Sequence, residues 1–245
     1  MAGSNGPRSD VRTVFASPWR SLSLVLATLV LAGAGTVVSR SGVFHVRNVD
    51  VEGSDHLTAP QVIKRAGLTE QTNVVWLDEG AVEDRLEQDP WVARASVIVD
   101  LPWSVRVRVV EREPIAVMEA PSGPALVAGD GTVLGPARRR GRSPLITTPP
   151  PWLRVGTVSS VAGAARALAS MEADLRTRVS RVEITLEGTL ESALRGGVRI
   201  AYGLTGGYAA KAEAIAEVLR WAERSGERLR RIDVSAPSAP AVTLG

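Results

Sequence analysis

The sequence predicts an α+β protein with a single transmembrane helix followed by two small domains, each built around a β-sheet. Three observations support this fold class. Residues 21–39 carry no charge, residues 44–114 follow the order strand, helix, helix, strand, strand, and residues 115–245 mix strand and helix patterns. We expect the second domain to be a mixed α/β domain with a mainly antiparallel sheet.

The composition limits the kinds of function that are possible. A chain of 245 residues that is 44% hydrophobic can fill one or two small cores. The sequence has no cysteine, which excludes a disulfide framework, a thiolate nucleophile and a cysteine-ligated metal. A net charge of +3 and a pI near 9.9 are compatible with nucleic acid, anionic lipid or an anionic cell wall as a neighbour, and do not choose among them.

The amino-terminal region predicts a membrane anchor. Residues 1–20 are polar and are typical of a disordered tail, whereas residues 21–39 lie uncharged between Arg20 and Arg40. As a helix, this segment would reach about 28 Å, close to a hydrocarbon core of about 30 Å. A cleavable signal peptide is the alternative, because Ala32-Gly33-Ala34 offers small residues at a possible cleavage site. Apolar residues resume after that site, which favours an uncleaved anchor.

The charges beside the segment predict its orientation. Arg8, Arg12 and Arg20 stand against Asp10 on the amino-terminal side. Such an excess of basic residues stays in the cytoplasm, so we expect everything after Arg40 to lie outside.

Residues 44–114 are expected to form the first domain. Val49 and Val51 alternate with polar residues as in a half-buried strand, which Gly53 ends. Thr58 and Gln61 have the spacing of a capping box at the start of a helix.

The second helix and the last two strands of this domain are predicted from similar patterns. Asp78 can cap a second helix, which ends before Pro90. Alternating apolar residues over 93–99 and 105–109 predict two strands, which a short turn at residues 101–103 should join into an antiparallel hairpin.

The second domain, residues 115–245, opens with a hairpin over 126–134 that turns at Asp130-Gly131. Residues 135–151 are predicted to form a loop because they are rich in Gly, Pro and Arg. Helices are expected over 164–175 and 211–221, the second ending at Gly226, and strands over 182–186, 190–194, 197–202, 231–235 and 241–244.

Several of these residues resemble a known pattern. Residues 44–114 are similar to the POTRA domain of the bacterial cell-division family FtsQ/DivIB, which combines a Val-x-Val-x-Gly strand, a Pro-x-Val-x-x-Ala phrase, a Leu-Pro turn and a Val-x-Glu-Arg-x-Pro exit. One departure lies at residues 70–73, where relatives usually place a glycine. The family's carboxy-terminal pattern recurs at residues 197–203, at Lys211 and at residues 232–237. The residues that match the POTRA pattern are Val49, Gly53, Pro90, Val92, Ala95, Pro102, Glu111, Arg112 and Pro114.

The resemblance implies a non-enzymatic scaffold without cofactor or metal, located in the bacterial inner membrane at the division septum. Such proteins bind the single-span coiled-coil partners FtsL and FtsB (also called DivIC) and help recruit or regulate the septal peptidoglycan synthase. The family's FtsB contact maps onto Lys211, Ile232, Asp233, Val234, Ser235 and Val242. Because Pro237 and Pro240 interrupt main-chain pairing, we expect the segment that can accept a partner strand to be shorter than in relatives, or to end at Ser235.

Other functions have weaker support. A POTRA-type chaperone or translocation module usually repeats the module or precedes a membrane barrel, and an exported wall enzyme needs a catalytic constellation. His45 and His56 lack a third metal ligand, Glu111 and Glu113 lie at the end of a strand, and residues 203–207 lack the lysine of a phosphate loop. The arginine run at residues 138–142 suits a solvated loop, or contact with lipid or wall polymer; the membrane segment argues against nucleic acid.

Overall fold

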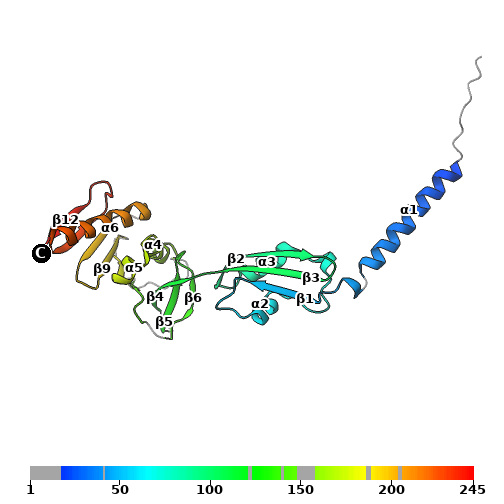
Figure 1. The fold of residues 1–245 in the computed structure, drawn as a ribbon, viewed down its shortest axis with the longest axis horizontal. Helices are drawn as coiled ribbons and strands as arrows, with labels where there is room; N and C mark the ends of the chain where they lie inside the picture. Colours follow the sequence, from blue (N-terminus) through cyan, green and yellow to red (C-terminus); the bar gives the residue numbers. More distant parts are fainter. Residues whose placement is uncertain are drawn as a thin grey trace, which may run out of the picture.

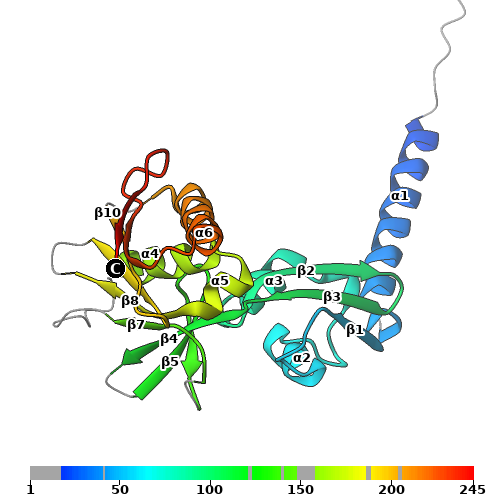
Figure 2. The ribbon, with the colours of Figure 1, turned by 60° about the vertical axis from the view of Figure 1, so that its left-hand side comes forward.

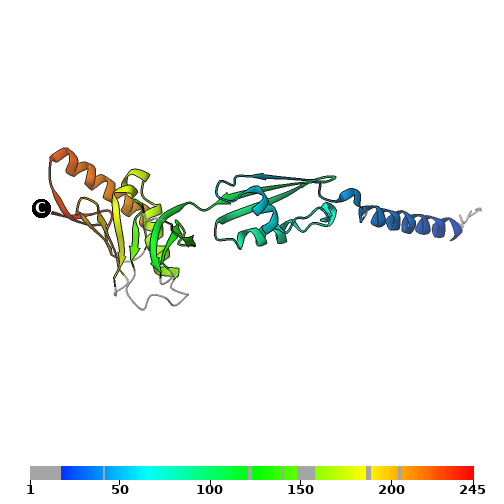
Figure 3. The same ribbon diagram turned by 90° about the horizontal axis from the view of Figure 1, so that it is seen from below.

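The chain folds into a long helix and two sheet-containing units that follow one another along the long axis of the molecule (Figures 1 and 3). The computed structural model describes residues 18–40, 42–120, 123–138, 141–147, 158–185, 189–203 and 206–245. Residues 1–17 of the predicted tail, and Arg139 and Arg140 of the arginine run, lie outside these residues.

Helix α1, Pro18–Ser39, includes the whole predicted apolar segment and begins three residues before it. Within the described residues, no helix combines the length and the apolar character that a bilayer crossing requires.

The three-stranded unit, residues 42–112, confirms the predicted order of one strand, two helices and two strands. Its sheet has the order β1-β3-β2, with β1 parallel to β3 and β2 antiparallel to β3. Its elements are η1 (Gly42–Phe44), β1 (Asn48–Glu52), α2 (Ala59–Ala66), η2 (Val74–Trp76), α3 (Glu79–Glu87), β2 (Val92–Asp100) and β3 (Ser104–Glu111).

Local sequence determines these helix boundaries. The Gln61 side chain accepts a hydrogen bond from the Thr58 N–H at 2.9 Å, and Asp78 Oδ1 accepts one from the Ala81 N–H at 3.0 Å. Gly67 ends α2 in the left-handed conformation, with φ 69°. Gly53 also has a positive φ, and a side chain there would collide with the Val109 carbonyl, which explains the glycine in the strand pattern.

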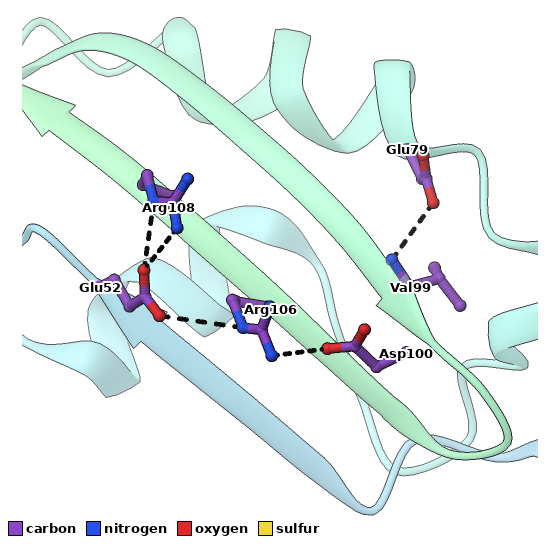
Figure 4. A network of polar contacts seen from close by, with 6 residues as sticks. All are labelled: Glu52, Glu79, Val99, Asp100, Arg106 and Arg108. Atoms are coloured by element: carbon purple, nitrogen blue, oxygen red, sulfur yellow. Dashed lines mark hydrogen bonds and ion pairs between the residues drawn. The ribbon is translucent and has the colours of Figure 1, made fainter.

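The two faces of this sheet differ in chemistry. One face buries Val105, Val107 and Val109 against α2 and α3. The opposite face carries an ion-pair network in which Glu52 contacts Arg108 at 3.0 Å and Arg106 contacts Asp100 at 3.0 Å (Figure 4). Strand alternation places these two sets of side chains on opposite sides, so the core lies on the helical side only.

The nine-stranded unit, residues 113–245, is a mixed sheet in the order β12-β11-β10-β9-β8-β7-β4-β5-β6. Five of its eight neighbouring pairs are antiparallel. Helices α4 and α6 pack with the sheet in one core, and Figure 2 shows α4, α5 and α6 gathered beside it. The elements are β4 (Pro114–Ala120), β5 (Gly123–Ala128), β6 (Val133–Pro136), β7 (Leu145–Thr147), α4 (Val158–Ala169), α5 (Ala173–Arg178), β8 (Val179–Ile184), β9 (Leu190–Leu194), β10 (Arg199–Gly203), α6 (Tyr208–Ser225), β11 (Leu229–Asp233) and β12 (Ala241–Leu244).

Two predictions for this unit need correction. The expected loop at residues 135–151 contains strand β7, which pairs in parallel with both β4 and β8 and completes the middle of the sheet. The expected helix at 164–175 is two helices, because the chain breaks after Ala169 and α5 begins at Ala173. The hairpin at Asp130-Gly131 and the helix stop at Gly226 are confirmed.

The exit from β3 joins the two units through two adjacent charged residues. The Glu111 carboxylate accepts hydrogen bonds from the backbone N–H groups of Asp55, His56 and Leu57, at 3.2, 2.7 and 2.8 Å. These bonds hold the loop between β1 and α2 against the end of β3. Replacing this charged acceptor by a neutral group would weaken the three hydrogen bonds, because hydrogen bonds to an ionised acceptor are the stronger ones.

Arg112, the next residue, makes hydrogen bonds to a different part of the structure. Its Nη1 donates to the carbonyls of Pro90 and Val92, and its Nε donates to Asp130 Oδ2 at 2.7 Å. Asp130 belongs to the β5–β6 turn, so this side chain connects the start of β2 with the nine-stranded unit. The Glu-Arg pair of the family pattern is therefore structural.

Glu111→Gln is expected to destabilise the three-stranded unit by about 1.5–3 kcal/mol, because one neutral amide oxygen replaces a charged acceptor of three hydrogen bonds. Hydrogen exchange of the Asp55, His56 and Leu57 amides measures this directly and should accelerate. Glu113→Gln is the matched control, because Glu113 is exposed two residues away. Equal exchange in both variants would contradict the assigned role.

Asp130 gives the junction a pH dependence. Burial raises the pKa of Asp130, but hydrogen bonds from Thr132 and Arg112 and the Arg112 charge outweigh this effect, so its pKa lies below the ordinary value. Ionised Asp130 therefore stabilises the fold above the unfolded-state pKa, and that stabilisation is lost as the pH falls through the lower folded-state pKa.

Thermal unfolding of the wild type and of Asp130→Asn between about pH 6 and pH 3 tests this sign. At the higher pH the wild type should have the higher unfolding temperature, and the difference in unfolding temperature between the two proteins should shrink as the pH falls. Asp84→Asn changes an exposed carboxylate and should leave the pH profile unchanged. A gap that stays constant with pH would rule out the ionic contribution.

Candidate interaction edges

Among the residues that the structure describes, the two sheets end in four edge strands, which are β1, β2, β6 and β12. An edge strand exposes backbone N–H and C=O groups that can pair with a strand from another chain. These four edges differ in how far the protein's own residues close them.

The edge of β2 is closed by a row of glutamates from α3. The carboxylates of Glu79, Glu83 and Glu87 accept hydrogen bonds from the backbone N–H groups of β2 residues. Residues 79, 83 and 87 are four apart, so their side chains lie on one face of the helix. The three bonds join Glu79 to Val99 at 3.3 Å (Figure 4), Glu83 to Val97 at 2.7 Å and Glu87 to Ala95 at 3.0 Å.

The spacing of these donors shows why the row blocks pairing. In an antiparallel pair, alternate residues direct their backbone groups away from the neighbouring strand. Ala95, Val97 and Val99 are such alternate residues of β2, so the glutamates occupy the N–H groups that an incoming strand would need. The Glu spacing is visible in the sequence, but its role depends on α3 lying along β2.

The edge of β6 is limited by its sequence, whereas the edge of β1 is not. Strand β6 has four residues and ends in Pro136, which has no N–H to donate. Strand β1 has five residues, and the ion pairs of Glu52, its last residue, lie on the sheet face and not at the edge.

Strand β12 forms the carboxy-terminal edge of the nine-stranded sheet, and all four of its residues are exposed. The Gly245 N–H donates to the Arg228 carbonyl at 2.7 Å, so by alternation Thr243 also faces β11. The backbone groups of Val242 and Leu244 then face away from the sheet. Their side chains are 40% and 46% exposed.

The residues expected to contact a partner fall into two groups. Ile232 and Val234 are fully buried, and β11 is paired on both sides, with β10 and with β12. Pro237 and Pro240 lie between β11 and β12, so they do not prevent β12 from forming. A charged residue in place of Val234 would therefore destabilise the core, so such a variant would not test partner binding. Of the predicted set, Val242 is the residue on the edge strand itself.

Lys211, Asp233 and Ser235 have identifiable structural contacts. Lys211 is buried, and its Nζ donates to the Tyr202 carbonyl at 2.7 Å; burial lowers the pKa of this lysine. Asp233 Oδ1 accepts from the Ser235 N–H at 2.9 Å. The Ser235 side-chain and backbone hydrogen bonds lower the pKa of Asp233, against the opposing effect of burial, and the charge of Arg231 adds to the lowering.

The residues weighed for chemistry also have structural surroundings. His56 stacks on Trp91 with ring centroids 3.6 Å apart, and the carboxylate of Glu111 is engaged by backbone donors. In the part of the chain that the structure describes, no group of three or more His, Cys, Asp or Glu side chains could hold a metal ion. In the arginine run, the Arg142 carbonyl accepts a hydrogen bond from Arg195 at 2.6 Å.

Replacing Glu83 by alanine tests the closure of β2. Hydrogen exchange at the Val97 amide should accelerate roughly tenfold, because that N–H loses a charged acceptor. Asp84→Ala, which removes an exposed carboxylate from the next position of α3, should leave Val97 unchanged. Unchanged exchange in Glu83→Ala would show that the carboxylate does not protect the edge.

Comparison with known proteins places these features in a family. Residues 44–112 match the family described as POTRA domain, FtsQ-type. The cell division protein FtsQ of Mycobacteroides abscessus is 27% identical over 90% of this chain and 68% of its own length. FtsQ of Mycobacterium leprae is 26% identical over 98% of this chain and 67% of its own length. The chain thus spans about two thirds of the length of these two relatives.

Two further matches cover less of the chain. FtsQ of Mycolicibacterium smegmatis is 30% identical over 54% of this chain and 39% of its own length. A solved structure of the extracytoplasmic domain of the cell division protein DivIB from Geobacillus stearothermophilus is 15% identical over 46% of this chain and 92% of its own length, with a TM-score of 0.32. Residues 44–112 therefore form an FtsQ-type POTRA domain, and the chain is similar to FtsQ cell-division proteins over most of its length.

Proposed function

We propose that this protein is a non-enzymatic, membrane-anchored scaffold of the divisome. In this proposal it binds FtsB/DivIC-like and FtsL-like single-span partners and helps recruit or regulate septal peptidoglycan synthesis. The observation that carries the proposal is the exposed edge strand β12, with Val242 and Leu244 on it. A partner strand that pairs with β12 gains main-chain hydrogen bonds, and the exposed side chains determine its register.

The closed edge of the POTRA domain supports this choice of surface. A chaperone or translocation module that receives strands on β2 would need the N–H groups that the α3 glutamates occupy. Partner pairing at β12 needs no such displacement. Strand β12 also lies at the end of the molecule opposite α1 (Figure 1), where it is distant from the proposed anchor.

The anchoring part of the proposal rests on α1. Its described apolar side chains are exposed, with Val25 at 56%, Leu29 at 64% and Leu31 at 73%. Leu26 and Val30 are also exposed, at 62% and 63%. At about 100° per residue, Val25, Leu26, Val30 and Leu31 are spread around the whole helix, and a helix that is apolar on every side suits lipid better than one protein partner. The arginine excess before the helix supports a cytoplasmic amino terminus and an external carboxy terminus in the inner membrane.

Val242→Pro separates main-chain pairing from side-chain contact. Proline removes the outward N–H of residue 242 and leaves the pairing of Thr243 with β11 intact. Loss of one hydrogen bond, about 1 kcal/mol, should weaken capture of the FtsB-like partner roughly fivefold in a pull-down with the purified partner.

Val242→Thr is the matched control, because threonine keeps both the N–H and the β-branched shape. It should bind close to wild type. Wild-type binding by Val242→Pro would overturn pairing at β12, and equal losses in both variants would indicate a contact made only by the side chain.

A further inference from the structure

The end of the POTRA domain that adjoins α1 brings together three segments that are distant in sequence. Asn73 Nδ2, just before η2, donates to the Ser39 carbonyl at the end of α1, at 2.8 Å. The Arg47 N–H donates to the carbonyl of Trp103, in the β2–β3 turn, at 2.9 Å. His45 and Asn73 form an isolated β-bridge that links these contacts. We call this region the proximal end and define it by Arg40, Arg47, Val75, Trp76, Leu101 and Trp103.

The proximal end exposes large apolar side chains that the packing of the domain does not require. Trp76 is 59% exposed, Leu101 66%, Trp103 41% and Val75 40%, whereas core residues such as Leu86 are fully buried. Grouped exposed apolar residues mark surfaces that contact something else.

Arginines accompany both tryptophans. The Arg40 guanidinium lies 5.6 Å from the centroid of the Trp76 ring, and that of Arg47 lies 5.1 Å from the Trp103 ring. Tryptophan and arginine together suit the headgroup layer of a bilayer, where the ring sits among apolar and polar groups and the cation meets phosphate.

Three acidic residues near this end make contacts within the domain. Asp78 caps α3, Asp100 pairs with Arg106 at 3.0 Å, and Glu79 accepts the Val99 N–H. The cations beside the tryptophans are Arg40 and Arg47, and these two guanidinium groups can meet the phosphates of an anionic surface.

We propose that the proximal end lies in the headgroup layer of the membrane that α1 enters, with anionic phospholipid as its ligand. This inference rests on the proposed anchoring by α1. The contact would fix the tilt of the POTRA domain by holding η2 and the β2–β3 turn against the bilayer at two separate points.

The sequence contains no cysteine, so single cysteines can carry an environment-sensitive fluorophore without interference. The full chain is reconstituted in nanodiscs of phosphatidylcholine and phosphatidylglycerol that contain lipid nitroxides at headgroup or mid-chain depth. Three labelled variants are compared: Leu101→Cys at the proximal end, Leu29→Cys in α1, and Ser238→Cys in the exposed β11–β12 loop.

We expect the headgroup nitroxide to quench the Leu101 label, the mid-chain nitroxide to quench the Leu29 label, and neither to quench the Ser238 label. Quenching at Leu101 should fall when Arg40→Gln and Arg47→Gln are introduced together, or when phosphatidylglycerol is omitted. A quenched Leu29 label with an unquenched Leu101 label would overturn the headgroup contact and leave the anchoring intact. An unquenched Leu29 label would overturn the anchoring itself.

Discussion

The Glu111 carboxylate and the Arg112 guanidinium connect the parts of the POTRA domain to one another and to the nine-stranded unit. Glu111 holds the loop after β1 through three backbone N–H groups, and Arg112 holds the start of β2 and reaches Asp130 in the next unit. Strand alternation sends adjacent side chains to opposite sides, which is why two neighbouring charges can serve two separate loops. Because only Arg112 and Glu113 separate β3 from β4, the orientation set at this exit passes directly into the nine-stranded sheet.

The sheet edges of this protein differ in how far they are closed, and the proposed partner pairing uses one that is open, β12. Glutamates on α3 occupy the outward donors of β2, and a short strand with a terminal proline limits β6. The carboxy-terminal edge has neither a glutamate row nor a proline within the strand, and all four residues of β12 are exposed. Closing β2 and limiting β6 leaves fewer edges through which the two sheets can pair with other strands, and β12 remains available to a partner.

Much of the POTRA domain could be predicted because its information is local: alternating valines, the Thr58 and Asp78 helix starts, and the turn at residues 101–103. Strand β7 could not be predicted because it has three residues and pairs in parallel with strands far away in sequence. The burial of Ile232 and Val234 was unexpected for a related reason. A strand pattern shows which residues alternate, but the order of strands determines which of them forms the edge, and here β12 covers β11.

The length of β3 has a consequence for the geometry of the whole assembly. Its eight residues span about 26 Å at about 3.3 Å per residue, so the POTRA domain raises the second sheet by at least that height above its proximal end. In the proposed assembly, a helical partner anchored in the same bilayer would rise about 1.5 Å per residue and would need a stem of about 18 residues to reach beyond the POTRA domain. The length of the POTRA domain would then select among partners. A partner whose pairing strand follows a long enough helical stem could bind, and one with a shorter stem could not.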